Sequence, residues 1–576
     1  MVTREVVITV VEEVIIVVAL LLMKDTEVLT VDKNTIKQMK RINYILFLGA
    51  SLLVANVKAQ EYTDIFRYGT EDLTGTARFK AMSGAFGALG GDFSAINVNP
   101  AGSAIFSGSE ISFSLTNNNH KRNITFLDRS SKQTKNDFNL NHFGIVLVLP
   151  NVSETWKKIS FGFNYLQTKV LDNDKFSYSA YNRRGIDNYF FDYATNGNNG
   201  NPFPLGTFSG GPDRVTANNQ RDIGEFFATL GKRQGYAAQM AYLGILSQVI
   251  SPNSGAATET AYHANGDALE RLQLYEVERS GYANKYNFNF ASQLGDFINL
   301  GLNLNFHNIN EKAFYSLRDN DFQAANPFLR YANHQQYINT KGEGFSLQLG
   351  TIIKATENLR LGVSYQSPTW YTMKEESHQE LKATVLNTNT GKEMDTDIDL
   401  INRYGDEIWY EREYKFRTPS AWTGSIAYTI MKRAILSVDY TYKAYENLKY
   451  TSNNMKGYNT AFNNDLGDTS TLRIGGEFRI PFQLLKDNPA TTNYVSLRAG
   501  YRYEQSPYRK AIATVGDLTG YSFGAGVTLG GIRLDASYDI AKQTNLYQMY
   551  DRVLTDNAQI KSTYGNFLFT FTAQLF

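Results

Sequence analysis

The stretch Ala77–Phe106 reads ARFKAMSGAFGALGGDFSAINVNPAGSAIF, and the chain changes character after it. The stretch is crowded with glycine and alanine, whose small size lets backbone pack closely against other structure, and glycine also permits positive φ. At most one short apolar helical pattern fits it. The motif Asn97-Val-Asn-Pro-Ala-Gly is typical of a turn. The stretch therefore predicts a compact plug that precedes a larger structure.

Long alternating segments follow the plug. From about Ser109 onward, apolar and polar residues alternate with a period of two, as in Ile111–Thr116. Strict alternation predicts a sheet with two unlike faces. No amphipathic helices alternate with these segments, which excludes a parallel α/β sheet. The pattern recurs about fourteen times, an even number that suits an antiparallel outer-membrane β-barrel of one chain.

The composition agrees with an all-β transmembrane fold. The 576 residues include 37 Tyr, 36 Phe, 45 Gly and no Cys, and the net charge is +1. The mean hydropathy of −0.35 is too polar for a bundle of membrane helices, whereas aromatic girdles around a polar interior are typical of outer-membrane barrels. The near-neutral charge argues against a nucleic-acid binder that relies on excess positive charge. The lack of Cys excludes a disulfide framework.

The connections between the segments alternate in length. Short ones include Gly295–Phe297 and Gly530–Gly531, and long ones include Asn117–Asp137 and Leu171–Gly281. Short periplasmic turns and long external loops are the rule in outer-membrane barrels. We therefore expect an N-terminal hatch at 60–107, a barrel at 108–576 and a large extracellular loop at 171–281. A soluble β-sandwich would not need this asymmetry together with an export signal.

The N-terminal region predicts export. Residues 39–59 have a basic start, an apolar run at Ile42–Val54 and a small residue, Ala59, before the expected cleavage site, as in a secretory signal peptide. Residues 1–38 are interpreted as an upstream extension that is not part of the mature protein, because Glu12 and Glu13 would make a spanning helix costly. The expected location is the outer membrane of a Gram-negative bacterium, with its lipid and the barrel-assembly machinery as partners.

One helical pattern in the large loop, Ile223–Ile250, has an apolar stripe. The stripe has two interpretations: packing on the barrel mouth or neighbouring loops, or an exposed groove that receives an apolar ligand. Its residues, which are the ligand-binding candidates, are Phe226, Phe227, Leu230, Tyr236, Met240, Leu243 and Leu246.

Charged residues fall on the polar phase of several strands. Such residues either pair across strands to hold the barrel and the plug together, or one Arg meets a ligand carboxylate. No His pair has metal-ligand spacing, so no metal site and no cofactor are expected, although a haem ligand among the His and Tyr residues stays open. Asp395, Asp397 and Asp399 lack the Gly and Glu of a calcium loop and predict a solvated acidic strand. No catalytic motif is present, so the chain is not expected to be an enzyme.

The plug carries a family resemblance. Residues 84–102, with the tripeptide Asn99-Pro100-Ala101, resemble the hatch of the FadL/TodX family of outer-membrane transporters, in a Bacteroidetes-type form. Two later stretches, Leu361–Pro368 and Thr418–Tyr428, are also similar to the family. The resemblance implies a fourteen-stranded barrel with a hatch in its lumen, and a gate formed by Gly84, Gly87, Gly90, Gly91, Asn99, Pro100 and Ala101. It also implies lateral release at a kinked third strand, Ile159–Val170, where Gly162 is the candidate weak point.

The resemblance implies a passive, hatch-gated channel for hydrophobic or amphipathic small molecules, such as long-chain fatty acids or aromatic hydrocarbons, that acts as a monomer. The very long second outer loop departs from typical members. The alternative is therefore a binding or secretion-associated barrel that recruits a protein partner or haem.

Overall fold

The computed structural model describes residues 65–575, with gaps at 151, 171–173, 217–218, 267–268, 326, 388–389, 400–409, 432, 454, 483–492, 510–513 and 551–552. All described residues belong to the second of two compact units, Val57–Phe576. The proposed extension at 1–38, the signal peptide at 39–59 and the first residues of the hatch lie outside the described residues. Among the described helices, none combines the length and apolarity needed to cross a membrane.

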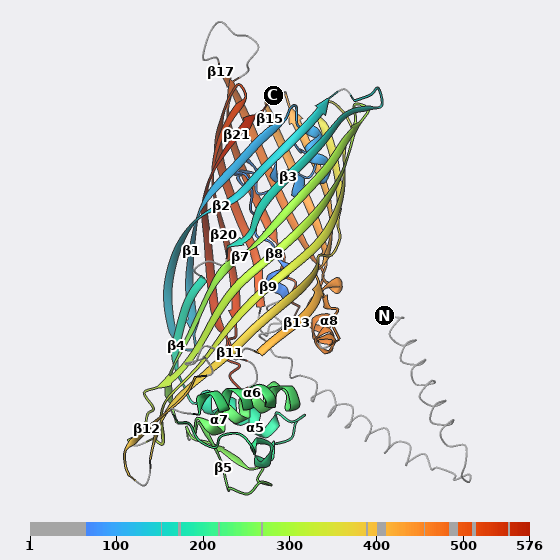
Figure 1. Cartoon of the computed structure of the whole chain (residues 1–576). Coiled ribbons are helices and arrows are strands. Elements are labelled where there is room, and N and C mark those ends of the chain that lie inside the picture. The colour runs from blue at the N-terminus through green and yellow to red at the C-terminus, as the bar shows by residue number, and fades with distance from the viewer. Residues whose placement is uncertain are drawn as a thin grey trace, which may run out of the picture. The chain divides into compact units, whose positions relative to one another are not determined.

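Antiparallel strands form a closed barrel (Figure 1). Closure is direct, because the first strand pairs with both the second and the last. The sheet has 19 strand segments, and these occupy 14 positions around the barrel. Four positions are each divided into two segments, and one further segment is a hairpin extension of its neighbour. The segments are β1 (Glu110–Phe126), β2 (Arg129–Pro150), β3 (Trp156–Val170), β4 (Asp174–Asn182), β7 (Arg271–Leu294), β8 (Ile298–Asn320), β9 (Leu329–Lys354), β10 (Leu359–Gln366), β11 (Trp370–Leu386), β12 (Glu393–Asp399), β13 (Tyr410–Arg417), β14 (Ser420–Ile430), β15 (Ala434–Ala444), β16 (Lys449–Tyr450), β17 (Thr469–Phe482), β18 (Asn493–Glu504), β19 (Thr514–Leu529), β20 (Ile532–Tyr547) and β21 (Ala558–Gln574).

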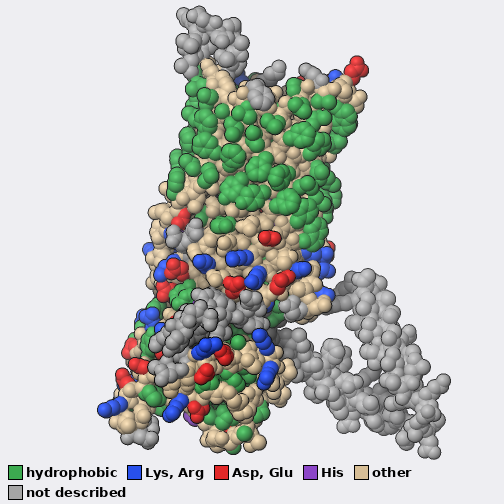
Figure 2. All heavy atoms as spheres, viewed as in Figure 1, with side chains coloured by type: hydrophobic (Ala, Val, Ile, Leu, Met, Phe, Trp, Pro, Cys, Tyr) green, Lys and Arg blue, Asp and Glu red, His purple; other side chains and the backbone are tan. Residues whose placement is uncertain are grey.

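The alternation of the sequence becomes the two faces of the barrel wall. Leu300, Leu302 and Leu304 of β8 are exposed on the outer face, whereas Asn303 and Asn305, on the alternate phase, are buried on the inner face. Figure 2 shows the result as a continuous apolar surface on one part of the barrel, next to a zone of charged side chains. An apolar outer band around a polar interior is the arrangement that a bilayer requires.

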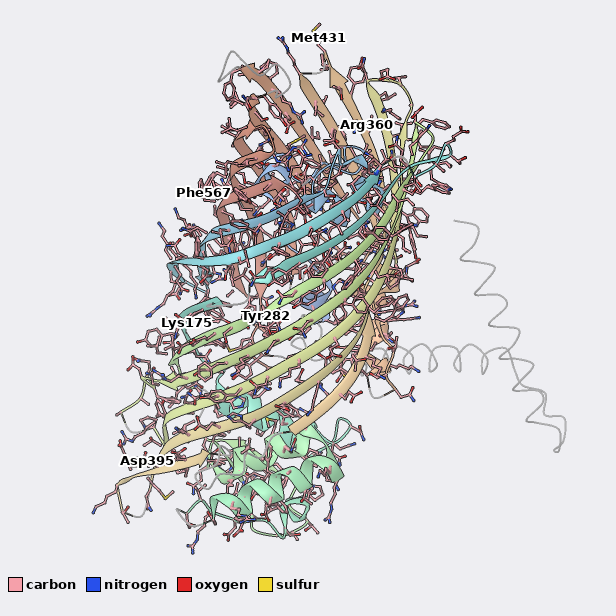
Figure 3. The ribbon with its side chains drawn as sticks, turned by 45° about the horizontal axis from the view of Figure 1, so that its top comes forward. Lys175, Tyr282, Arg360, Asp395, Met431 and Phe567 are labelled. Carbon is pink, nitrogen blue, oxygen red and sulfur yellow. The ribbon has the colours of Figure 1, made fainter. Side chains whose placement is uncertain are left out.

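The strands extend well beyond this apolar band, which the sequence did not reveal. The connection expected at 117–137 is a two-residue turn between β1 and β2, and β7 begins at Arg271, so the large loop is shorter than expected. Outside the membrane the outward face is polar and the inward face packs on other protein, so the pattern that marks membrane strands is lost. The predicted acidic strand exists as β12, and Figure 3 labels its Asp395 at the end of the molecule opposite Met431.

A compact outer domain at 183–270 lies between β4 and β7. It contains α5 (Ile186–Asn196), η3 (Leu205–Phe208), α6 (Gln220–Gln234), α7 (Tyr236–Leu246), β5 (Ile250–Pro252) and β6 (Tyr262–Ala264). The predicted single helix is divided at Gly235, whose φ of +83° ends α6 and begins α7. Smaller elements on a neighbouring outer connection are η4 (Tyr445–Asn447), η5 (Lys456–Tyr458) and α8 (Asn459–Asp465).

Candidate functional site

The hatch, described here from residue 65 to 107, lies within the barrel (Figure 1). Its elements are α4 (Ala77–Ala81), η1 (Ser94–Asn97) and η2 (Pro100–Ile105). The barrel wall receives it through glycines, at which an added Cβ would overlap hatch backbone or a hatch side chain. These wall positions are Gly301, Gly350, Gly362, Gly475, Gly500 and Gly524. The hatch and wall therefore meet backbone against backbone, as the small residues of the hatch predicted.

The Asn99-Pro100 turn is a fixed point of this contact. The Asn99 amide donates to the carbonyl oxygens of Gly87, at 2.7 Å, and of Thr351 on β9, at 3.0 Å. Its oxygen accepts from the backbone N–H of Ala101 and so caps η2, with Pro100 in the first helical turn. The turn therefore joins two parts of the hatch to each other and to the wall.

Of the other predicted gate residues, Gly87 lies against the wall, whereas Gly84, Gly90 and Gly91 pack within the hatch. Gly84, Gly90 and Gly91 have φ values of +78°, +60° and +61°, which glycine adopts without strain. The backbone N–H groups of Phe86 and Gly87 both donate to Asp439 of β15, each at 2.9 Å. An anionic wall residue thus holds the hatch through its backbone.

Ion pairs also connect the hatch to other strands of the wall. Arg78 of α4 pairs with Glu477 of β17 at 2.8 Å, and Lys80 pairs with Asp539 of β20 at 2.6 Å. Glu477 also pairs with Arg498 at 2.6 Å, and all of these side chains are buried. For these residues the structure corresponds to the first of the two interpretations, in which lumen charges hold the barrel and the hatch together. Arg360, which Figure 3 labels, donates to the carbonyl of Leu89 in the same way.

A cavity of about 160 Å³ lies between the first described hatch residues and the wall. Its lining combines apolar groups, such as Leu73, Phe79 and Val98, with charged ones. Lys285 of β7 is paired with Glu71 of the hatch at 2.6 Å. Lys443 of β15 and Arg473 of β17 also line the cavity. Among the described residues, neither side chain forms an ion pair, and the Nε of Arg473 is buried without a hydrogen-bond acceptor.

Two interrupted strands border the same cavity. The break between β10 and β11 contains Pro368 and the break between β13 and β14 contains Pro419, and Thr369 and Pro419 are cavity residues. Proline cannot donate to a strand ladder and is confined to such breaks. Both prolines lie in the stretches that are similar to the family, Leu361–Pro368 and Thr418–Tyr428. A proline inside a strand pattern is the sequence signal that marks such a break.

The second and third strands separate beside the cavity. Their pairing ends at His142 and Leu166, and the rest of β2 pairs with β1 alone. In place of β2, the carbonyl of Thr168 accepts from the hatch N–H of Asp72 at 3.0 Å. Gly162 lies within the regular ladder, opposite Val146 and Asn289, so the separation begins four residues after the position that the sequence suggested.

The seven ligand-binding candidates of the loop form a core. Phe227, Leu230, Met240, Leu243 and Leu246 are buried in one apolar cluster, with Phe226 and Tyr236 partly buried against it. This placement corresponds to the packing interpretation and brings none of the seven to the lumen cavity.

A buried ion pair also stabilises the outer domain. Arg271 at the start of β7 pairs with Asp187 of α5, and both side chains are fully buried. Burial raises the pKa of the Asp187 carboxyl, while Arg271 and the N–H of Gly266 oppose that rise. The pair fixes the domain at the point where the chain enters the barrel.

These features define a class: an outer-membrane barrel whose lumen is plugged by its own N-terminal segment. The family model described as "Outer membrane protein transport protein (OMPP1/FadL/TodX)" matches residues 277–574, more than half of the chain. The chain therefore belongs to the FadL/TodX family of outer-membrane transport proteins. That membership places it in the outer membrane of a Gram-negative bacterium and points to transport rather than catalysis.

Solved structures are similar to the chain at low sequence identity. A Pseudomonas aeruginosa FadL homologue has a TM-score of 0.50 at 12% identity and covers 88% of this chain and 99% of its own. The P. putida toluene transporter TodX has a TM-score of 0.44 at 12% identity, with 88% and 99% covered. No curated protein sequence is significantly similar to this chain.

Proposed function

We propose that the protein is a passive channel for hydrophobic or amphipathic small molecules, gated by movement of the hatch. The cavity between hatch and wall carries this proposal. Hatch residues from Tyr68 to Val98 form one side of it and residues of the barrel wall form the other, so a ligand held there would touch both. The hatch has a closed and a displaced position, and a ligand that binds the displaced position more tightly would increase its population. The size of that increase is set by the difference between the ligand's affinities for the two positions.

The cavity favours an amphipathic ligand with an anionic end, such as a long-chain fatty acid. Three cations, Lys285, Lys443 and Arg473, and two carboxylates, Glu71 and Asp72, line it beside apolar groups such as Leu73 and Phe79. Lys285 is paired with Glu71, so the cations that would meet the ligand are Lys443 and Arg473. A carboxylate would accept charge-assisted hydrogen bonds from both. TodX of P. putida is a toluene transporter, and toluene carries no charge, so a neutral aromatic hydrocarbon would leave these cations unused.

The separation of β2 from β3 is the proposed lateral exit. Leu166 and Thr168, which lie at the separation, also line the cavity. A ligand could thus move from the cavity toward the lipid without crossing the hatch. The contact between Asp72 and Thr168 closes this route and would break when the hatch moves.

Binding to the purified barrel tests the ligand class. The double variant Lys443→Gln/Arg473→Gln should bind oleate about tenfold or more weakly, because a hydrogen bond to a charged group contributes about 1.5–3 kcal/mol. Its binding of a neutral hydrocarbon of equal chain length should be unchanged. Lys312→Gln, an exposed lysine of β8 on the outer face, is the matched control. Equal oleate affinity in all three proteins would contradict the assignment.

A second candidate function, recruitment of a protein partner, is favoured by the outer domain, a compact insertion between β4 and β7 whose apolar core continues onto the outer strands. A variant in which residues 184–269 are replaced with a short turn distinguishes transport from partner recruitment. Loss of a stoichiometric partner with full fatty-acid uptake would assign the domain to recruitment.

A further inference from the structure

Lysines gather on the outer face of β20, β21, β1 and β2, beyond the apolar band. Register places them in two adjacent rows across these neighbouring strands. Lys121 lies opposite Thr134 and Thr563, and Lys542 lies opposite Thr563. In the next row, Lys132 and Lys561 both lie opposite Asn123. All four lysines are exposed.

The four lysines follow a zigzag. In the order Lys132, Lys121, Lys561 and Lys542, each lysine is the diagonal neighbour of the next on an adjacent strand, a separation of about 7–8 Å. Among the described residues, none of the four ammonium groups forms an ion pair with a carboxylate. Thr and Asn fill the remaining positions of the two rows. Four cations so close together repel one another unless an anion lies between them.

Among the described residues, no nearby carboxylate forms an ion pair with a lysine of the zigzag. Asp517 of β19 is the exposed acidic residue at its edge, and its oxygens accept from the Tyr503 hydroxyl and the Ser506 N–H, each at 2.7 Å. Asp137 of β2 lies on the opposite phase of its strand, because it pairs with Asn118.

The two rows that contain the lysines lie directly outside the apolar band. On these strands Phe138, Phe567, Tyr538 and Phe523 form an exposed aromatic row; Figure 3 labels Phe567 on the barrel surface. The next row outward contains Tyr521 and Ile540, and Lys542 follows Ile540 by two residues, about 7 Å along the strand. The lysines are therefore at the depth of lipid headgroups on the side of the long connections.

The opposite side of the barrel has no such excess. Beyond its aromatic row of Phe306, Phe345 and Trp370, exposed lysines alternate with carboxylates. Lys374 lies opposite both Lys341 and Glu413, and it pairs with Glu376 at 3.3 Å. The difference between the two sides indicates that the zigzag is a local feature, not a general property of the rim.

We propose that Lys121, Lys132, Lys542 and Lys561 form a binding surface for the phosphate groups of outer-leaflet lipid, namely those of lipid A. Each phosphate offers several anionic oxygens to neighbouring ammonium groups, and the aromatic rows below receive the acyl chains. Clustered lysines at a membrane surface attract anionic headgroups, and each adds to the binding. The surface fixes the rotation of the barrel in the leaflet and surrounds one side with bound lipid.

Native mass spectrometry of the detergent-solubilised full chain tests this surface with bisphosphorylated lipid A as the probe. The wild-type protein should retain lipid A, and a variant with all four lysines changed to Gln should bind it about tenfold or more weakly. Dephosphorylated lipid A should bind weakly to both. Changing the four lysines to Arg should preserve binding.

The matched control is the set Lys312→Gln, Lys341→Gln, Lys374→Gln and Lys415→Gln on the charge-balanced side, which should leave lipid A binding unchanged. If the first Gln set does not give a heat-modifiable folded barrel, Lys121→Gln/Lys561→Gln should show a smaller loss in the same direction. Equal losses in the two sets, or equal binding of the dephosphorylated lipid, would overturn the proposal and indicate non-specific attraction or another partner.

Discussion

The hatch and the outer domain are both inserted against the same barrel, but different forces hold them. The hatch contacts the wall through backbone, glycine and ion pairs such as Arg78 with Glu477, and through small apolar clusters such as that of Phe93 and Phe106 with β2. The outer domain is organised around an apolar cluster that includes Phe190, Met240 and Leu243, and this cluster continues onto inward side chains of the outer strands such as Leu317.

Under the proposed function, this difference separates a part that moves from a part that is fixed. Polar and charged contacts can be exchanged for water as the hatch shifts, with a small net change in free energy. Separating the outer domain would expose its whole apolar cluster to water, at about 25 cal/mol for each Å². We therefore expect the position of the hatch to depend on ligand and the outer domain to stay rigid.

The largest expected effect is on the outer domain. Asp187→Ala leaves Arg271 buried with Asp319 as its remaining carboxylate, at 3.9 Å. Breaking a buried pair costs about 3–5 kcal/mol. Limited proteolysis should cut the domain in the variant while the barrel stays intact. Asp222→Ala, at an exposed site in α6, is the control and should behave as wild type. If the outer domain of the Asp187 variant resisted proteolysis, the apolar core alone would be enough to hold the domain in place.

The next largest effect concerns the hatch. In Gly301→Val the new side chain overlaps the backbone of Pro100 and Ala101. Overpacking of this kind costs about 3 kcal/mol and favours a displaced hatch. Entry of a small dye through the barrel should therefore rise in cells that produce the variant. Gly424→Val, where nothing lies within 4 Å of the new Cβ, should leave dye entry unchanged. Equal dye entry in both would mean that the hatch does not close the lumen.

A smaller effect is expected at the turn of the hatch. Asn99→Ala removes the cap of η2 and the two hydrogen bonds to Gly87 and Thr351, at a cost of about 1–2 kcal/mol. Hydrogen exchange should become faster in the hatch but not in α7. Unchanged exchange in the hatch would show that its glycine contacts hold it without this turn.

The fold was predictable because its main signal is local. Alternation along each strand and the short turns are visible in the sequence, and the small residues of 77–106 gave the plug. Strand ends outside the membrane were not predictable, because there Arg271–Gly281 and similar segments pack on protein or face water.

The site was less predictable than the fold, because it depends on register and contact. Lys443 and Arg473 meet in one cavity only once β15 and β17 are paired and the hatch is placed. The apolar stripe of the loop was visible, but nothing local distinguishes a packed stripe from a ligand groove. The zigzag of Lys121 and Lys561 likewise requires closure of the barrel between its first and last strands.

The central claim is that the hatch must move for transport, and a cross-link tests it most directly. The chain has no cysteine, and the hydroxyl oxygens of Ser83 in the hatch and Ser522 in β19 lie 2.6 Å apart. In Ser83→Cys/Ser522→Cys, oxidation should reduce uptake of labelled oleate to the level of cells without the protein, and reduction should restore it. Each single variant should transport normally. Full uptake through the oxidised, cross-linked barrel would contradict the account.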